Sequence, residues 1–196
     1  FEEAPLVAAI RSQKGWEMIE ALVSGPGGRK AALKEDSDKN NALHLLVGEF
    51  QDPTAAMSIL KIVPETAFHR NAQGILPIEM ACMVMMPEEV ILGIALVDLP
   101  INIDDRDGIR VYKDRGQSWA FLTGDCDDHM VHVVADILSI CSFQQLQELC
   151  FWKEDGAEQN VLDRATPKCQ EAMNRALRFL GRFELLGEGP LFSDMQ

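Results

Sequence analysis

Two similar stretches of this chain constrain its fold more than any other feature of the sequence. They are residues 41–48 (NALHLLVG) and residues 74–82 (GILPIEMAC), and the correspondence of Asn41 with Leu76 sets a spacing of 35 residues. Each predicts a turn and a short helix that leads into a longer apolar helix. Self-similarity at such a period is typical of solenoids, in which one helical unit stacks on the next. The pattern therefore favours a repeat architecture over an enzyme core.

Helix start signals recur along the whole chain and predict an all-α fold. Asn41, Ser118 and Asn160 are predicted N-caps, because their side chains can accept a hydrogen bond from the first turn. Residues 142–145 (SFQQ) form a capping-box pattern for one further helix. Helices are predicted to start at or near Pro5, Trp16, Asn41, Pro53, Pro77, Pro87, Ser118, Asp127, Ser142, Asn160 and Pro167.

The predicted boundaries follow from the apolar patterns and the glycines. Residues 29–40 are polar and are predicted to be a connection, and Gly181 is predicted to end the last helix. The second helix is expected to bury one face, made of Trp16, Ile19, Leu22 and Val23. Residues 90–97 are apolar all round, so this helix must be covered on both sides. That requirement suits an interior unit of a stack.

Composition and charge exclude several classes of function. The formal net charge is −13, from 18 basic and 31 acidic residues, which repels phosphate backbones and argues against nucleic-acid binding. A basic partner surface is easier to accommodate. The longest apolar run, residues 90–97, is far shorter than the span of about 20 residues that membrane insertion needs.

Cysteine usage points to a reducing compartment. The five cysteines are an odd number without close regular spacing, which favours reduced, buried thiols and a cytoplasmic location. The chain does not begin with methionine, so it looks like a fragment whose targeting segment is missing.

The short-helix pattern resembles the ankyrin-repeat signature T-P-L-H-x-A. Aligned on the histidine, the spacings between starts are 37, 35, 42 and 42 residues, against about 33 for the family. A charged insertion at residues 103–117 and the extra helix after Ser142 account for the two long spacings. The five starts are residues 4–7 (APLV), 41–44 (NALH), 76–81 (LPIEMA), 118–121 (SWAF) and 160–165 (NVLDRA).

The resemblance implies a role for each position of the signature. The first position caps the helix, the second suits proline, and the third packs on the neighbouring unit. Only His44 keeps the histidine, whose ring is implied to hydrogen-bond the backbone of the adjoining turn. The implied structural residues are Asn41, Leu43, His44, Pro77, Ile78, Ser118, Asn160 and Leu162.

The expected fold is therefore an ankyrin-type solenoid of about five degenerate helix-turn-helix repeats. It covers residues 1–181, and residues 182–196 form a C-terminal tail or linker. The alternative fold is an unrelated all-helical bundle of paired helices.

Residues 186–189 (LGEG) are similar to the start of a protein kinase glycine-rich loop, although Phe192 stands where the third glycine would be. The junction resembles that of protist and algal proteins in which ankyrin repeats precede a kinase domain. An alternative function follows from this resemblance, namely a regulatory segment N-terminal to a kinase domain that this chain lacks.

Two patterns in the sequence resemble metal sites, and neither is favoured. Cys126, His129 and His132 have spacing that lets two of them share a helix face, but no fourth zinc ligand is fixed. The segment around Asp105 and Asp107 lacks the first ligand and the closing glutamate of a calcium loop. We expect no metal and no cofactor.

The expected function is a non-catalytic scaffold that binds another protein through the concave face and turns of the stack. No paired-carboxylate, nucleophile or metal constellation predicts an enzyme. For each candidate contact, an ordinary solvated surface residue is the alternative. The candidates are Asp36, Asp38, Lys39, Arg70, Asn71, Gln73, Asp105, Arg106 and Asp107.

Overall fold

The computed structural model describes residues 5–99, 116–125, 130–154 and 156–185, and these ranges contain helices and no strand. None of their helices combines the length and the apolar character that crossing a membrane requires. Several sequence predictions lie outside these ranges. They concern Asp105, Arg106 and Asp107, the calcium-like loop, Cys126 and His129, and the kinase-like residues 186–192.

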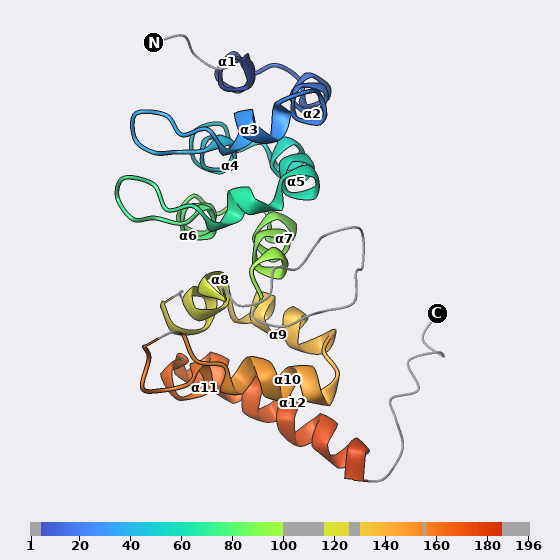
Figure 1. The fold of residues 1–196 in the computed structure, drawn as a ribbon. Coiled ribbons are helices and arrows are strands. Elements are labelled where there is room, and N and C mark those ends of the chain that lie inside the picture. Colours follow the sequence, from blue (N-terminus) through green and yellow to red (C-terminus); the bar gives the residue numbers. More distant parts are fainter. Residues whose placement is uncertain (1–4, 100–115, 126–129, 155, 186–196) are drawn as a thin grey trace.

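The helices form two stacked columns (Figure 1). One column holds short helices: α1 (Pro5–Arg11), α4 (Ala42–His44), α6 (Pro77–Met83), α8 (Gln117–Ala120) and α11 (Val161–Arg164). In the other column, each helix packs on the next: α2 (Trp16–Ser24), α5 (Pro53–Ile62), α7 (Glu88–Val97), α9 (Val131–Ser139) and α12 (Pro167–Leu185). The remaining elements are α3 (Gly28–Leu33), α10 (Phe143–Phe151) and the irregular turns η1 (Leu45–Glu49), η2 (Pro64–Phe68) and η3 (Phe121–Asp125).

Side-chain hydrogen bonds cap several helix starts where the sequence predicts them. Asn41 Oδ1 accepts the N–H of His44 at 3.1 Å, and Asp52 Oδ1 accepts that of Ala55 at 3.0 Å. The capping box at Ser142 is confirmed, because its side chain and that of Gln145 each bond the other's backbone N–H. The side chain of Asn160 caps α11 by accepting the N–H of Asp163 at 2.9 Å. Such caps satisfy N–H groups that have no partner within the helix.

The core runs along the stack between the columns. Ile59 and Leu60 of α5 are completely buried, and each such side chain stabilises the fold by about 1.5–3 kcal/mol through removal of apolar surface from water. The prediction that residues 90–97 need cover on both sides is confirmed: α7 packs on α5 and also on α9. Val90, Ile94 and Val97 have no exposed surface.

Two glycines let methionines from neighbouring elements approach closely. A Cβ atom on Gly93 of α7 would lie 2.9 Å from Met57 Sδ of α5. One on Gly48 of η1 would overlap the side chain of Met80 from α6. Each glycine therefore leaves the space that a flexible thioether from the adjacent element fills.

Two boundary predictions are wrong. Residues 28–33 form α3 inside the predicted polar connection, because Gly27 turns the chain at φ 78° and Ala32 is then completely buried. Gly181 does not end the last helix, since α12 continues to Leu185. Its missing side chain instead accommodates the ring of Phe143, whose Cε2 would lie 3.3 Å from a Cβ at this position.

Three predicted side-chain roles also need correction. Ser118 is not an N-cap: the cap residue is Gly116 at φ 59°, and Asp98 Oδ2 accepts the Ser118 N–H at 2.7 Å. Trp16 is 41% exposed rather than part of the buried face of α2. In α11 the buried residue is Val161, and Leu162 is only half-buried.

The first three short helical segments, which are α1, α4 with η1, and α6, are each followed by a non-glycine residue in the left-handed region. These residues are Gln13 (φ 49°), Gln51 (φ 48°) and Met85 (φ 55°). After α1 the next N–H, of Lys14, bonds five residues back to Ala9, and after α6 that of Met86 bonds five back to Ala81. Such helix ends normally use glycine, because other residues are strained there.

We predict that Gln51→Gly increases the free energy of unfolding by about 0.5–1 kcal/mol, because it removes left-handed strain at a helix end. The matched control is Gln147→Gly at an exposed position within α10. This change should decrease the free energy of unfolding by a similar amount, because glycine is a poor helix former. Urea denaturation measures both. Destabilisation by both changes would contradict the backbone assignment at Gln51.

Candidate interaction surface

A tight turn at residues 36–40 precedes α4 and is held by the side chain of Asp36. Its Oδ1 accepts the N–H groups of Asp38 and Asn40, both at 2.9 Å. The backbone closes the same turn, because the Asp36 N–H bonds to the Asn40 carbonyl at 2.9 Å and the Lys39 N–H bonds to the Asp36 carbonyl at 3.1 Å. Lys39 takes the left-handed position at φ 59°.

The turn at residues 71–75 precedes α6 and repeats this pattern bond for bond, 35 residues later. Asn71 Oδ1 accepts the N–H groups of Gln73 and Ile75 at 3.1 and 3.0 Å. The Asn71 N–H bonds to the Ile75 carbonyl at 3.0 Å, and the Gly74 N–H bonds to the Asn71 carbonyl at 2.9 Å. Gly74 occupies the left-handed position at φ 79°. The two turns are therefore copies of one structural unit.

Hydrogen bonds join the two turns directly, and the loops that carry them project side by side from the stack (Figure 1). The Ala72 N–H donates to the Asp38 carbonyl at 2.8 Å, and Asn71 Nδ2 donates to Asn40 Oδ1 at 3.2 Å. A backbone bond between successive turns fixes their register. The exposed parts of the loops are thus held on a fixed frame.

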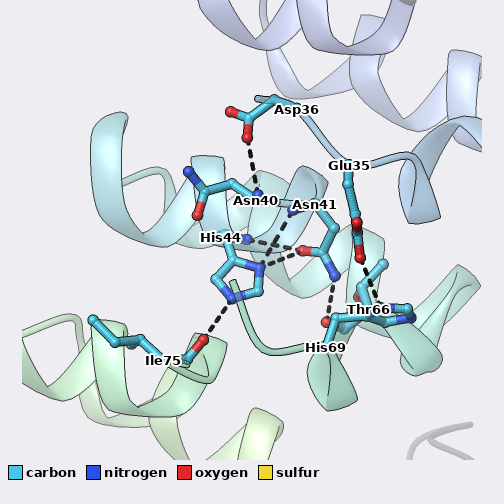
Figure 2. A network of polar contacts seen from close by, with 8 residues as sticks. All are labelled: Glu35, Asp36, Asn40, Asn41, His44, Thr66, His69 and Ile75. Atoms are coloured by element: carbon cyan, nitrogen blue, oxygen red, sulfur yellow. Dashed lines mark hydrogen bonds and ion pairs between the residues drawn. The ribbon is translucent and has the colours of Figure 1, made fainter. Parts of the chain in front are cut away.

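Asn41 and His44 lie behind the turns and link three elements (Figure 2). Asn41 Nδ2 donates to the Thr66 carbonyl in η2 at 2.7 Å. His44 Nε2 donates to the Ile75 carbonyl at the start of the next unit, at 3.0 Å, which is the bond implied for this histidine. Both side chains are completely buried, so their polar groups depend on these partners.

The protonation state of His44 follows from its neighbours. A carbonyl only accepts, so Nε2 carries the proton and Nδ1 is left to accept from the Asn41 N–H at 3.4 Å. Burial lowers the pKa of His44, because the charged ring would lose its hydration, while the Ile75 hydrogen bond acts in the opposite direction. Among the ionisable neighbours, His69 lowers the pKa further, whereas Asp36 and Glu35 raise it.

Ion pairs surround this network at the surface. Arg11 reaches Asp36 at 3.4 Å, and His69 Nδ1 lies 3.6 Å from Glu35 (Figure 2). Both pairs have a partner that is at least 40% exposed, so solvent screens them and each contributes little to stability. Arg70 donates to the Gly74 carbonyl at 2.6 Å and to Glu79 at 3.1 Å.

The described residues among the predicted contacts differ in their roles. Asp36 and Asn71 hold their own turns, and Asn71 is only 6% exposed. Asp38, Lys39 and Gln73 are exposed, and no side-chain bond is seen for them in the described residues. Arg70 is exposed but braces the second turn. The exposed candidates therefore lie on the two copied turns.

The described residues contain no group of three or more histidine, cysteine and acidic side chains that could hold a metal ion. His132, the described member of the zinc pattern, pairs with Glu88 at 3.2 Å across α9 and α7. Burial raises the pKa of the Cys141 and Cys150 thiols to about 12. Both thiols are therefore protonated at neutral pH and poor nucleophiles.

Sequence reasoning missed several residues that build this surface. The sequence predicts Asp36 and Asn71 as contacts, although an Asp or Asn at the same place in two turns is itself a signal of a side chain that bonds its own backbone. Asn40 and Thr66 gave no local signal, because their partners lie 31 and 25 residues away.

No protein-family model, curated protein or solved structure matches this chain. The interpretation of the surface therefore rests on the residues of the chain itself.

We predict that His44 makes stability depend on pH. Because its pKa is lower in the folded than in the unfolded state, the unfolded chain binds more protons between the ordinary value of 6.5 and the folded value. The free energy of unfolding therefore falls as the pH falls from above 6.5 through this window. The slope contributed by His44 is at most about 1.4 kcal/mol per pH unit.

Chemical denaturation between pH 8 and pH 5 measures this slope, because the ordinary pKa of histidine lies within that range. His44→Gln should be less stable at pH 8 and should show a shallower pH dependence than the wild type. Gln73→Ala, which changes an exposed residue that does not titrate, should keep the wild-type slope. An unchanged slope in His44→Gln would rule out this residue as the source.

Proposed function

We propose that this chain is an ankyrin-type stack of about five degenerate units that acts as a non-catalytic scaffold for binding another protein. The observation that carries the proposal is the pair of turns at residues 36–40 and 71–75. They repeat one set of hydrogen bonds at a spacing of 35 residues and bond to each other. Copied units that bond to their neighbours are what a solenoid requires.

The packing order supports a solenoid over a closed bundle. The long helices α2, α5, α7, α9 and α12 pack in chain order, each on the next. In a closed bundle of paired helices, the first and last members would share one core. Here α2 and α12 lie at opposite ends of the column, with α5, α7 and α9 between them (Figure 1).

The copied turns supply a rigid binding surface in this proposal. Asp38, Lys39 and Gln73 are exposed on turns whose backbones are fixed by hydrogen bonds, so a partner would meet groups that are already ordered. The net charge of −13 favours a partner with a basic surface.

Hydrogen exchange separates a stack from a bundle. We predict that Leu43→Asp, which buries an unpaired charge, increases amide exchange in α4, α5 and α6 and leaves α10 and α12 close to wild type. The reason is that each unit of a stack contacts only its neighbours. Gln73→Asp at an exposed position is the control and should change neither region. Equal loss of protection in α12 would contradict the stack.

Affinity capture from the native organism tests the binding function. We predict that a triple variant, Asp38→Ala, Lys39→Asn and Gln73→Ala, retains the partner at least about tenfold less well than the wild type. Asn is chosen at Lys39 because it tolerates a left-handed backbone. The melting temperature should stay unchanged, because these side chains are exposed. Equal retention by the variant, or no partner for the wild type, would contradict the proposal.

A further inference from the structure

Two methionines at the end of α6 are unusually exposed. Met83 is 62% exposed and Met85 is 79% exposed, although the residues beside them in sequence are partly or completely buried. Exposed single apolar residues are common, but these two lie on one short segment. Met80, one turn earlier on α6, is half-buried against Gly48, so the methionine surface continues toward the preceding unit.

The backbone at Met85 adds an independent observation. This residue is left-handed at φ 55° and ends α6, a position that glycine fills without strain. The exposed side chain contributes little burial in return. The same left-handed position follows α1 at Gln13 and η1 at Gln51, so what distinguishes Met85 is a large apolar side chain that is left exposed.

Acidic residues continue directly from the methionines. Pro87, Glu88 and Glu89 are exposed, whereas Val84 is half-buried and Met86 is buried, and we name the exposed set Met83, Met85, Pro87, Glu88 and Glu89 the methionine edge. The dipole of α7 explains why acids suit its first turn, but it does not explain the methionines. The basic group seen at this segment in the described residues is His132, which pairs with Glu88.

We propose that the methionine edge is a docking site for a lysine- or arginine-rich segment of another protein that carries bulky apolar side chains. The apolar side chains pack on Met83 and Met85, whose flexible thioethers adapt to different shapes. The cationic side chains pair with Glu88 and Glu89. This inference deepens the proposed binding function and rests on it, and it assigns a contact surface apart from the copied turns.

The negative charge of the chain favours a basic segment over a second copy of the chain as the occupant. Each copy has a net charge of −13, and the methionine edge is itself acidic, so two edges repel each other. Glu88 already pairs with His132, and an acidic or purely apolar partner would add no opposite charge at either glutamate. A basic segment with apolar side chains satisfies both parts of the edge.

Selection from a random peptide library displayed on phage, against the whole chain, tests the proposal. The peptides recovered should be enriched in lysine or arginine together with leucine, phenylalanine or methionine. Their binding should weaken at least about tenfold in the double variant Met83→Ser, Met85→Gly. This variant keeps the fold, because glycine suits the left-handed position. Phe151→Ser, at a residue of α10 that is 52% exposed, is the control and should bind like the wild type.

A second pair of variants tests the charges. Glu88→Gln with Glu89→Gln should weaken binding about three- to tenfold at low salt, and the difference should disappear at about 0.5 M salt because screening removes it. The matched change Glu17→Gln with Glu20→Gln removes the same charge from α2 and should have a smaller effect.

Three outcomes overturn the inference. They are peptides without basic residues, peptides that bind the methionine variant as well as the wild type, and no enrichment at all. Sedimentation that shows a dimer dispersed by the methionine variant would identify a second copy as the occupant and also overturn it. The proposed scaffold function is judged separately, by capture through the copied turns, so its failure can be distinguished from a failure of this inference alone.

Discussion

The structure depends on apolar faces that no single helix pair can bury. A helix such as α7 has apolar residues on all sides and is stable only between α5 and α9. This burial supplies most of the stabilisation, but it is not directional. Direction and register come from polar groups, above all His44 bonding Ile75 and the turn at Asp38 bonding Ala72. Apolar packing holds the units together, and buried hydrogen bonds determine how they are aligned.

The parts of the fold that follow local rules could be predicted from the sequence. The caps at Asn41, Ser142 and Asn160 depend on partners three residues away, so a short pattern contains all the information. Ser118 has the same local pattern, but a carboxylate 20 residues earlier takes its N–H, and no short pattern reveals that. For the candidate site, the sequence predicts exposure at the turns but not that Asp36 and Asn71 point back into them. The burial of Trp119 likewise depends on Leu149, whose carbonyl accepts its indole N–H at 3.2 Å.

Unequal spacing makes the recurring short helices hard to recognise in the sequence. The left-handed residues that follow the first three short helical segments are 38 and 34 residues apart, counted as 51 minus 13 and 85 minus 51. The longer interval includes η1, a wider turn in which the Asp52 N–H bonds six residues back to Leu46. The two intervals differ by four residues, and α5 nevertheless packs on both α2 and α7. Constant geometry along the stack therefore does not require a constant spacing in the sequence.

The consecutive packing of α2, α5, α7, α9 and α12 also has a mechanical consequence. The principal contacts join neighbours, so a small rotation at each junction adds to the next and the stack can bend as an elastic spring does. The stiffness of the stack should then vary along its length, and the junction between α4 and α6 should resist bending most. Within the described part of the chain, only that junction combines apolar packing with the bonded turns and the buried histidine. A load applied to the two ends of the stack would separate the less stiff junctions first and leave the junction between α4 and α6 intact.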